Sequence, residues 1–327
     1  MVNPIDSPLV HKRAPEQVLL TSAGKNPEGC WVFEGTLPPG LPGLPAPGPG
    51  GSCTATLLAV ELVRQAKIAY THLAWDVPLD WAFIINELSF TWTREPATMP
   101  ALHTEPLLVR VRSDAMQTRN GRIRDLQLTG ELLAGGTLIG TGRGDFTCLP
   151  ARSYQALRRN AAPDPGHSTA KEGTVLIDVA LGTETLTGQL AWNREDRFIF
   201  DHASDHVPGI LITHATLKAH QLLTGTAAGH INLLCHNFAE YNAPIAVHAS
   251  LTEPGHTRIS ITQNGHEVAT GHCRASEPAG TTNQAGPNPF HRLLPPTPEP
   301  AHPPTNRHWR QPPVAGYTDP RSQPVVL

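Results

Sequence analysis

The sequence lacks paired cysteines and long apolar runs. Its five cysteines are widely spaced and include no C-x-x-C pair, so neither a disulfide framework nor a zinc knuckle is expected. No uninterrupted apolar run reaches about 18 residues, and the N-terminal segment MVNPIDSPLVHKRAPE has no apolar core of the signal-peptide kind. We therefore expect a soluble cytoplasmic protein with no membrane partner and with reduced, packed thiols at Cys30, Cys53, Cys148, Cys235 and Cys273.

A basic block is also missing. The 327 residues carry a net charge of −3, which argues against a nucleic-acid partner and favours small-molecule or protein partners. The glycine-rich stretch Gly140 to Phe146, GTGRGDF, is not followed by a helix, so it is not a phosphate loop or a dinucleotide fingerprint, and no cofactor is expected. The spacing of His202, His206, His214 and His220 does not fit a metal site, so no metal is expected.

One apolar stretch stands out at Phe200 to Leu223, with the sequence FDHASDHVPGILITHATLKAHQLL. Pro208 suits the first turn of a helix, where its missing N–H has no partner in any case, and Asp205 and His206 can cap that helix. The helix is apolar on nearly every side, so other structure must surround it. Polar His214 is therefore unusual at its position.

An earlier stretch repeats this pattern. Residues 52–66 align with residues 205–219 at a constant offset of 153. Glu61 then falls opposite His214, and Arg64 falls opposite Leu217. The alignment predicts an internal duplication, with helices near 55–72 and 207–223.

Aromatic and β-branched runs between turn signals predict antiparallel strands around each helix. In the first copy we expect strands near residues 17–21, 30–33, 82–92, 106–113, 122–131 and 137–149. In the second copy we expect them near residues 174–180, 189–200, 231–242, 244–252, 257–263 and 267–275. The dipeptide Asn264-Gly265 is typical of a hairpin turn.

One buried helix with antiparallel strands around it, twice over, predicts an α+β tandem double hotdog, in which two antiparallel sheets each wrap around a long central helix. We expect the first hotdog at residues 1–152, a linker at 153–171 and the second hotdog at 172–276. The tail, residues 277–327, is rich in proline and poor in aliphatic residues, so we expect it to be disordered and outside the fold.

A Pro/Gly loop at residues 37–51 distinguishes the first copy. Its composition is incompatible with a helix or a strand ladder. Phe33 to Ser52 spans 19 residues where Phe200 to Asp205 spans 5, so the first copy is expected to carry an insertion of about 14 residues. The loop is then either a solvated insertion or a lid or docking loop beside a pocket.

Three motifs occur in a recognisable order: VHKRAPEQVLLT from Val10 to Thr21, ELVRQA with the downstream DVPLDWAF, and FDHASDHVPG from Phe200 to Gly209. Together they resemble the A-factor biosynthesis (AfsA-type) hotdog family over roughly residues 10–275. The resemblance implies an enzyme that joins a β-ketoacyl group from its carrier protein to dihydroxyacetone phosphate, on the way to γ-butyrolactone signals in specialised metabolism. The residues that match the family pattern are Glu61, Arg64, Gln65, Asp201, His202, Asp205 and His206.

The second helix departs from the family pattern. The family has Glu-x-x-Arg-Gln there, whereas this chain has His214, Leu217 and Lys218. Related dehydratases and thioesterases form their site between two copies, from a loop histidine of one and a helix acid of the other. We therefore expect one catalytic site, with His202 from the second copy and Glu61 from the first. The opposite combination, Gly35 with His214, lacks an acid.

Glu61 has two interpretations. It forms a structural ion pair with Arg64, or it is a catalytic or substrate-orienting carboxylate whose pKa burial raises toward neutrality. Arg64 is expected to hold an anionic group, and backbone N–H groups near Gly209 are expected to hold a thioester oxyanion. The full set of expected substrate-binding residues is Arg64, Gln65, Asp201, Asp205, His206, Gly209 and His214.

These observations leave several functions open. The first is acyl transfer from an acyl or β-ketoacyl thioester, presented on acyl carrier protein or coenzyme A, to a small hydroxylated acceptor. Dehydration, cyclisation or thioester hydrolysis on the same scaffold is the alternative within enzymes. A catalytically inactive protein that binds an acyl chain is the alternative outside them. A double hotdog is already a pseudodimer, so a monomer and a homodimer are both possible.

Overall fold

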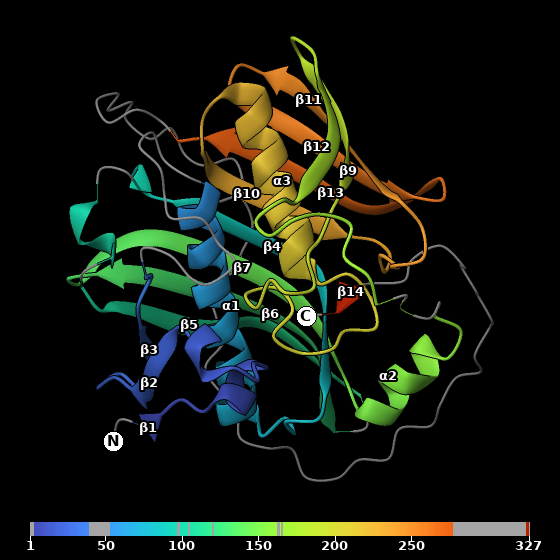
Figure 1. The fold of residues 1–327 in the computed structure, drawn as a ribbon. Coiled ribbons are helices and arrows are strands. Elements are labelled where there is room, and N and C mark those ends of the chain that lie inside the picture. Colours follow the sequence, from blue (N-terminus) through green and yellow to red (C-terminus); the bar gives the residue numbers. More distant parts are fainter. Residues whose placement is uncertain are drawn as a thin grey trace, which may run out of the picture. The chain divides into compact units, whose positions relative to one another are not determined.

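Two long helices, one in each half of the chain, organise the fold in a computed structural model (Figure 1). The structure describes residues 3–38, 53–96, 99–103, 105–119, 121–161, 164, 166–276 and 325–326. The Pro/Gly loop expected at residues 37–51 lies outside these ranges from residue 39 onward. Most of the expected tail, residues 277–327, also lies outside them.

In the first half, three short strands (β1 to β3) precede helix α1 in the sequence and four longer strands (β4 to β7) follow it. The strands predicted at residues 82–92 and 137–149 are confirmed residue for residue. The elements of this half are β1 (Asn3–Pro4), η1 (Ser7–Val10), η2 (Pro15–Gln17), β2 (Leu20–Lys25), β3 (Trp31–Gly35), α1 (Cys53–Trp75), β4 (Ala82–Trp92), η4 (Pro100–His103), β5 (Leu107–Arg119), β6 (Arg122–Ala134) and β7 (Thr137–Leu149).

The second half repeats this order around helix α3. A short helix, α2 (Ala151–Arg158), joins the halves. The remaining elements are β8 (Leu176–Leu181), β9 (Thr185–Leu190), α3 (Gly209–Thr224), β10 (Ala228–Cys235), β11 (Ile245–Glu253), β12 (His256–Gln263) and β13 (His266–Ala275).

Strand order confirms the internal duplication. In each half the strand that follows the helix (β4 or β10) pairs with the last strand (β7 or β13), and the strand that precedes the helix (β3 or β9) lies further out. The two half-sheets are not separate, however. β4 pairs antiparallel with β10, with Leu88 opposite Leu233 and Phe90 opposite Ile231, so the sheet runs without a break from one half into the other.

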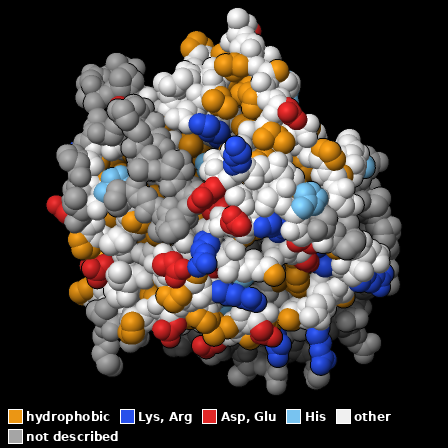
Figure 2. Space-filling view, in the orientation of Figure 1, with side chains coloured by type: hydrophobic (Ala, Val, Ile, Leu, Met, Phe, Trp, Pro, Cys, Tyr) orange, Lys and Arg blue, Asp and Glu red, His pale blue; other side chains and the backbone are white. Residues whose placement is uncertain are grey.

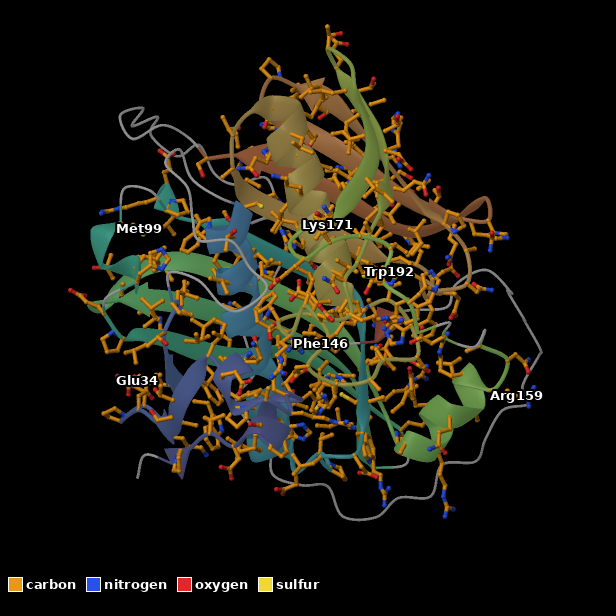
Figure 3. All side chains as sticks on the ribbon, in the orientation of Figure 1. Glu34, Met99, Phe146, Arg159, Lys171 and Trp192 are labelled. Atoms are coloured by element: carbon orange, nitrogen blue, oxygen red, sulfur yellow. The ribbon has the colours of Figure 1, made fainter. Side chains whose placement is uncertain are left out.

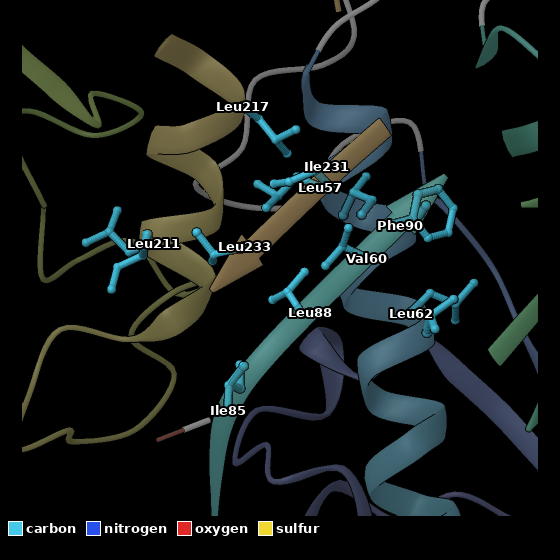
Figure 4. Packing of buried hydrophobic residues seen from close by; sticks show 14 of the residues in the cluster. Leu57, Val60, Leu62, Ile85, Leu88, Phe90, Leu211, Leu217, Ile231 and Leu233 are labelled. Carbon is cyan, nitrogen blue, oxygen red and sulfur yellow. The ribbon is translucent and has the colours of Figure 1, made fainter. Parts of the chain in front are cut away.

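Apolar side chains from both helices pack over this seam (Figure 4). Leu57 of α1 and Leu217 of α3 lie beside Ile231 of β10, and all three are fully buried. The helices also contact each other directly. The fold is therefore a tandem double hotdog whose two central helices share one core.

Glycine lets α1 lie close to β7. A Cβ added at Gly142 would lie 3.0 Å from Val63 Cγ1, and one at Gly140 would lie 2.6 Å from the Phe90 ring. Larger residues at these positions would collide with core side chains. The stretch GTGRGDF thus serves helix–sheet packing.

Three strand predictions have wrong bounds, and one of them is the strand expected at residues 231–242, which ends at Cys235. The first strand begins at Leu20, because Gln17 ends the 3-10 helix η2. The strand expected at residues 189–200 ends at Leu190. The Asp196 carboxylate accepts the backbone N–H groups of Phe198 and Ile199 at 3.0 and 3.4 Å, and this side-chain turn competes with an extended ladder.

The end of β9 at Leu190 changes the comparison between the connections that lead into the two helices. The connections from the preceding strand to the helix are residues 36–52 and 191–208, which are nearly equal in length. The first copy therefore carries no long insertion. Gly35 is the last residue of β3, whereas His202 lies in a loop, so Gly35 is not the counterpart of His202.

Two residues of the tail belong to the fold. Val325 and Val326 form β14, which pairs with Ile85 and Ile84 of β4, so the expectation that the whole tail lies outside the fold is wrong for these residues.

All five cysteines are free, and Cys30 is exposed rather than packed. Acidic and basic side chains are interspersed on the face shown in Figure 2. Among the described helices, none has the length and apolarity to span a membrane.

Leu233→Ala tests the seam. Leu233 has no exposed surface, and its truncation should lower the free energy of unfolding by about 2–5 kcal/mol, because buried methyl groups are lost and a cavity remains. Leu181 on β8 is 58% exposed, so Leu181→Ala should change that free energy by less than about 0.5 kcal/mol. Urea unfolding measures both, and equal losses would contradict a shared core at the seam.

Candidate active site

Glu61 lies at the centre of a buried ion network on α1. Its Oε2 accepts a hydrogen bond from Arg64 Nε at 2.6 Å, and its Oε1 accepts one from Arg64 Nη2 at 2.7 Å. Lys12 Nζ, from the segment before β2, lies 3.5 Å from Oε1. The Glu61 side chain is 0% exposed and that of Arg64 is 11% exposed. The network therefore pairs charges that would be costly to bury alone.

Gln65 fastens the N-terminal segment to this network. Its Nε2 donates to Glu61 Oε1 and to the Gln17 carbonyl, each at 2.9 Å. Its Oε1 accepts the Leu19 N–H at 2.8 Å. Gln65 is fully buried, so it holds structure together and does not reach a ligand site directly.

The expected rise in the pKa of Glu61 is wrong. Burial does raise it, but the charges of Arg64 and Lys12 and the hydrogen bonds from Arg64 and Gln65 outweigh burial and lower the pKa to about 2. Glu61 is therefore ionised at neutral pH. It is a poor general base, and its contacts suit the positioning of Arg64.

A small cavity opens beside Arg64, where segments of both halves meet. Its free volume is about 40 Å³, space for a few water molecules. The residues that line the cavity do not include Glu61. The lining residues are His11, Lys12, Arg64, Ile199, Asp201, His202, Ser204, Pro208, Gly209 and Ile210.

His202 and Asp201 form a dyad at this cavity. His202 Nδ1 lies 2.6 Å from Asp201 Oδ1, while Asp201 Oδ2 accepts the Arg13 N–H at 2.7 Å. Burial raises the pKa of Asp201, but the hydrogen bond from His202 and the charge of Lys12 lower it overall. The ionised Asp201 carboxylate can only accept a hydrogen bond, so in a neutral His202 ring the proton lies on Nδ1. Nε2 then has a lone pair that can accept a proton from a substrate. The His202 side chain is 37% exposed.

The N-terminus of α3 also faces the cavity. Gly209 and Ile210 are the first residues of the helix and line the cavity, and N–H groups at this position have no carbonyl partner within the helix. Pro208 is the N-cap residue rather than the first helical residue. The amides near Gly209 are thus available to a ligand in the cavity.

Asp205 and His206 lie elsewhere. No side chain caps α3, because Asp205 accepts Tyr154 Oη at 2.6 Å and Arg158 Nε at 3.1 Å, both from α2. His206 Nδ1 lies 2.6 Å from Asp205, and its ring packs edge-on against Phe238. The expected capping role is wrong. This pair fastens α2 to the second half and does not line the cavity.

The second helix has no comparable ion network. His214 is buried, and burial together with the charge of Lys218 lowers its pKa to about 4. Its Nδ1 has no hydrogen-bond partner within the described part of the chain. Leu217 takes the place of Arg64 and is fully buried in the core. His214 therefore does not join the predicted substrate-binding residues at the cavity.

Sequence reasoning missed His11 and Lys12. His11 Nε2 lies 3.0 Å from His72 Nε2, its ring meets Phe83 edge-on, and burial lowers its pKa to about 3, so it stays neutral. Lys12 Nζ donates to the Phe198 carbonyl at 3.1 Å. Both residues lie in the motif VHKRAPEQVLLT, but no local pattern reveals that this segment folds back onto α1.

The chain is similar to several known proteins. A sequence profile of the A-factor biosynthesis hotdog domain matches residues 1–150 and 157–277. A 2-oxo-3-(phosphooxy)propyl 3-oxoalkanoate synthase from Streptomyces virginiae is 26% identical over 233 residues, covering 68% of this chain and 78% of that protein. A synthase of the same name from Streptomyces griseus is 25% identical over 283 residues, covering 82% and 92%. An acyl-ACP thioesterase structure from Bacteroides thetaiotaomicron aligns at 11% identity with a TM-score of 0.47, covering 74% of this chain and 96% of that one.

Glu61→Gln tests the ion network. It should lower the free energy of unfolding at pH 7 by about 3–5 kcal/mol, because Arg64 and Lys12 keep their buried charges without a counter-ion. The pKa of Glu61 is lower in the folded protein than its ordinary value of 4.5. The difference between wild type and variant is therefore complete above about pH 5 and should shrink as pH falls toward 2.

Glu131→Gln is the matched control, since Glu131 pairs with a half-exposed Arg110, and it should cost less than about 1 kcal/mol. Urea unfolding at several pH values measures both variants. A Glu61→Gln protein as stable as wild type would contradict the network.

Proposed function

The chain belongs to the A-factor biosynthesis hotdog family, and on that premise we propose that it is an acyltransferase that joins a 3-oxoacyl group to dihydroxyacetone phosphate. The product named for the relatives, a 2-oxo-3-(phosphooxy)propyl 3-oxoalkanoate, is the ester of these two parts. A thioester is the natural donor, because thiolate is a good leaving group and acyl groups are carried as thioesters. The donor is an acyl group on a carrier protein or coenzyme A.

The observation that carries the proposal is the composition of the cavity. It combines a histidine supported by a carboxylate, free amides at a helix N-terminus and a buried guanidinium. These are the groups that acyl transfer to a hydroxyl requires: a base, an oxyanion site and an anchor for an anionic acceptor.

His202 is the proposed base. Its Nε2 takes the proton of the acceptor hydroxyl as that oxygen attacks the thioester carbonyl carbon, and Asp201 orients the ring and stabilises its cation. The carbonyl oxygen becomes an oxyanion held by the N–H groups of Gly209 and Ile210. When the carbonyl re-forms, the C–S bond breaks and the thiolate takes the proton from His202. An ester and a free thiol leave.

Arg64 is the proposed phosphate anchor. Glu61 occupies its Nε and Nη2, whereas Nη1 forms no hydrogen bond or ion pair with another side chain in the part of the chain that the structure describes. Glu61 therefore acts as a positioning residue that fixes the guanidinium, and Gln65 fixes Glu61 in turn. Lys12 adds a second positive charge to the cavity wall.

Substrate binding must enlarge the cavity. Its free volume of about 40 Å³ is smaller than the acceptor, so we expect the loop of residues 191–208 to move when substrate enters. This loop carries Asp201 and His202, so the same movement would place the base against the bound hydroxyl.

His202→Gln tests the base. The wild-type protein, incubated with a 3-oxobutanoyl carrier-protein thioester and dihydroxyacetone phosphate, should form the ester, followed by mass spectrometry. His202→Gln should lower kcat/KM by about 10²–10⁴-fold, because proton transfer is lost. His248→Gln changes an exposed histidine on β11 and should leave the rate unchanged.

Other products would point elsewhere. Release of the free 3-oxo acid alone would indicate a thioesterase, and loss of water or ring closure would indicate a dehydratase or cyclase. Saturable thioester binding without turnover would indicate an acyl-binding protein. Each of these results would overturn the proposed acyl transfer.

Arg64→Lys tests the anchor. Lysine keeps the charge but loses the planar fork, so KM for dihydroxyacetone phosphate should rise about tenfold or more. KM for dihydroxyacetone, which has no phosphate, should change much less. Equal changes for both acceptors would contradict a phosphate contact and favour a purely structural role.

A further inference from the structure

Lys67 is a buried amine that forms no direct ion pair with a described residue. It lies one helical turn after Arg64 on α1, and it is 3% exposed. Its Nζ forms no hydrogen bond or ion pair with any residue that the structure describes. Lys12, the other buried lysine, differs because it meets Glu61 at 3.5 Å and the Phe198 carbonyl at 3.1 Å. Of these two lysines, Lys67 is thus the one whose Nζ has no hydrogen bond or ion pair within the described residues.

Glycine and aromatic residues make a slot for this amine between α1 and the sheet. A Cβ added at Gly144 of β7 would lie 3.3 Å from Lys67 Nζ, and one at Gly130 of β6 would lie 3.6 Å from Lys67 Cε. Nζ lies 6.0 Å from the ring centre of Phe146, a β7 residue labelled in Figure 3. Any larger side chain at Gly144 would crowd the amine.

The slot retains free space beside Lys67. Its volume is about 20 Å³, room for one water-sized group, and its walls are mostly apolar. Arg64 lines both this slot and the cavity that contains His202. Since Arg64 and Lys67 are three residues apart on one helical face, their Cβ atoms are about 5–6 Å apart. The slot and the candidate active site are therefore neighbours.

Burial also makes the amine reactive. Desolvation lowers the pKa of Lys67 to about 7, although the charge of Asp114 acts in the opposite direction. A large fraction of the side chain is therefore an unprotonated amine at neutral pH. Desolvated lysines of this kind attack carbonyl carbons.

We propose that Lys67 captures a ketone as an imine, with the slot widening toward Arg64 to admit the ketone. The amine lone pair adds to the carbonyl carbon, the carbinolamine loses water, and a C=N bond replaces C=O. No oxidant or reductant is needed. The identity of the ketone rests on the proposed function, in which both substrates carry one, and the 3-oxo group lies two carbons from the thioester carbon that reacts beside His202.

Reductive trapping tests the proposal. The wild-type protein is incubated with 3-oxobutanoyl-N-acetylcysteamine and sodium cyanoborohydride, and the adduct is located by peptide mass mapping. The expected result is one reduced adduct on Lys67 and none on Lys12. Butanoyl-N-acetylcysteamine, which lacks the ketone, should give none. Lys67→Met is of similar volume and should abolish trapping without loss of the fold.

Three results would overturn the imine. They are no adduct, an adduct spread over exposed lysines such as Lys25 and Lys171, or an adduct that forms without reductant, which would be an amide from direct acylation. Ester formation is measured in parallel with the carrier thioester and dihydroxyacetone phosphate. Turnover without trapping refutes only the role of Lys67. Trapping without ester formation refutes only the proposed acyl transfer.

Discussion

The ion network around Glu61 is the interaction on which the candidate site depends. Each buried charge in it would cost several kcal/mol alone, so Arg64, Lys12 and Glu61 are stable only as a set. The same contacts that neutralise these charges also assemble the cavity. Glu61 fixes the guanidinium, Gln65 draws the N-terminal segment onto α1, and Lys12 reaches the Phe198 carbonyl of the second half. The contacts that neutralise the buried charges are therefore the same contacts that hold the walls of the cavity in place.

The two copies contribute different parts to this site. The first copy supplies a helix that keeps its charged residues, whereas the second supplies a helix N-terminus and the loop with Asp201 and His202. In the second helix, His214 is buried and neutral, and Leu217 packs in the core. Two identical subunits could not carry different site residues in this way, because every substitution would appear in both of them.

Local patterns predicted the elements that local physics decides. The strands at residues 82–92 and 137–149 and the turn at Asn264-Gly265 follow from alternation and turn chemistry, and the structure has all of them. The run Phe198 to Phe200 looked equally strand-like, but Asp196 captures its amides in a turn. The ion pair that does most to lower the pKa of Glu61, with Arg64, was one of the two interpretations of the sequence, whereas the smaller contribution of Lys12 comes from a distant segment and was not foreseen. The cavity was predictable only in part, because Arg64 and His202 were foreseen and His11 was not.

The seam between β4 and β10 and the contacts of the N-terminal segment with the second half have a consequence for folding. Lys12 meets Phe198, and the Arg13 amide meets Asp201, across separations of 186 and 188 residues. Contacts of such sequence separation form slowly, because loop-closure entropy is lost before the contact is gained. The first copy leaves the ribosome with the ionic face of α1 and the edge of β4 uncovered, and both stay so until the loop before α3 and then β10 have been synthesised. The nascent chain is thus most vulnerable to aggregation after its first hotdog has emerged, and a chaperone would act in that interval.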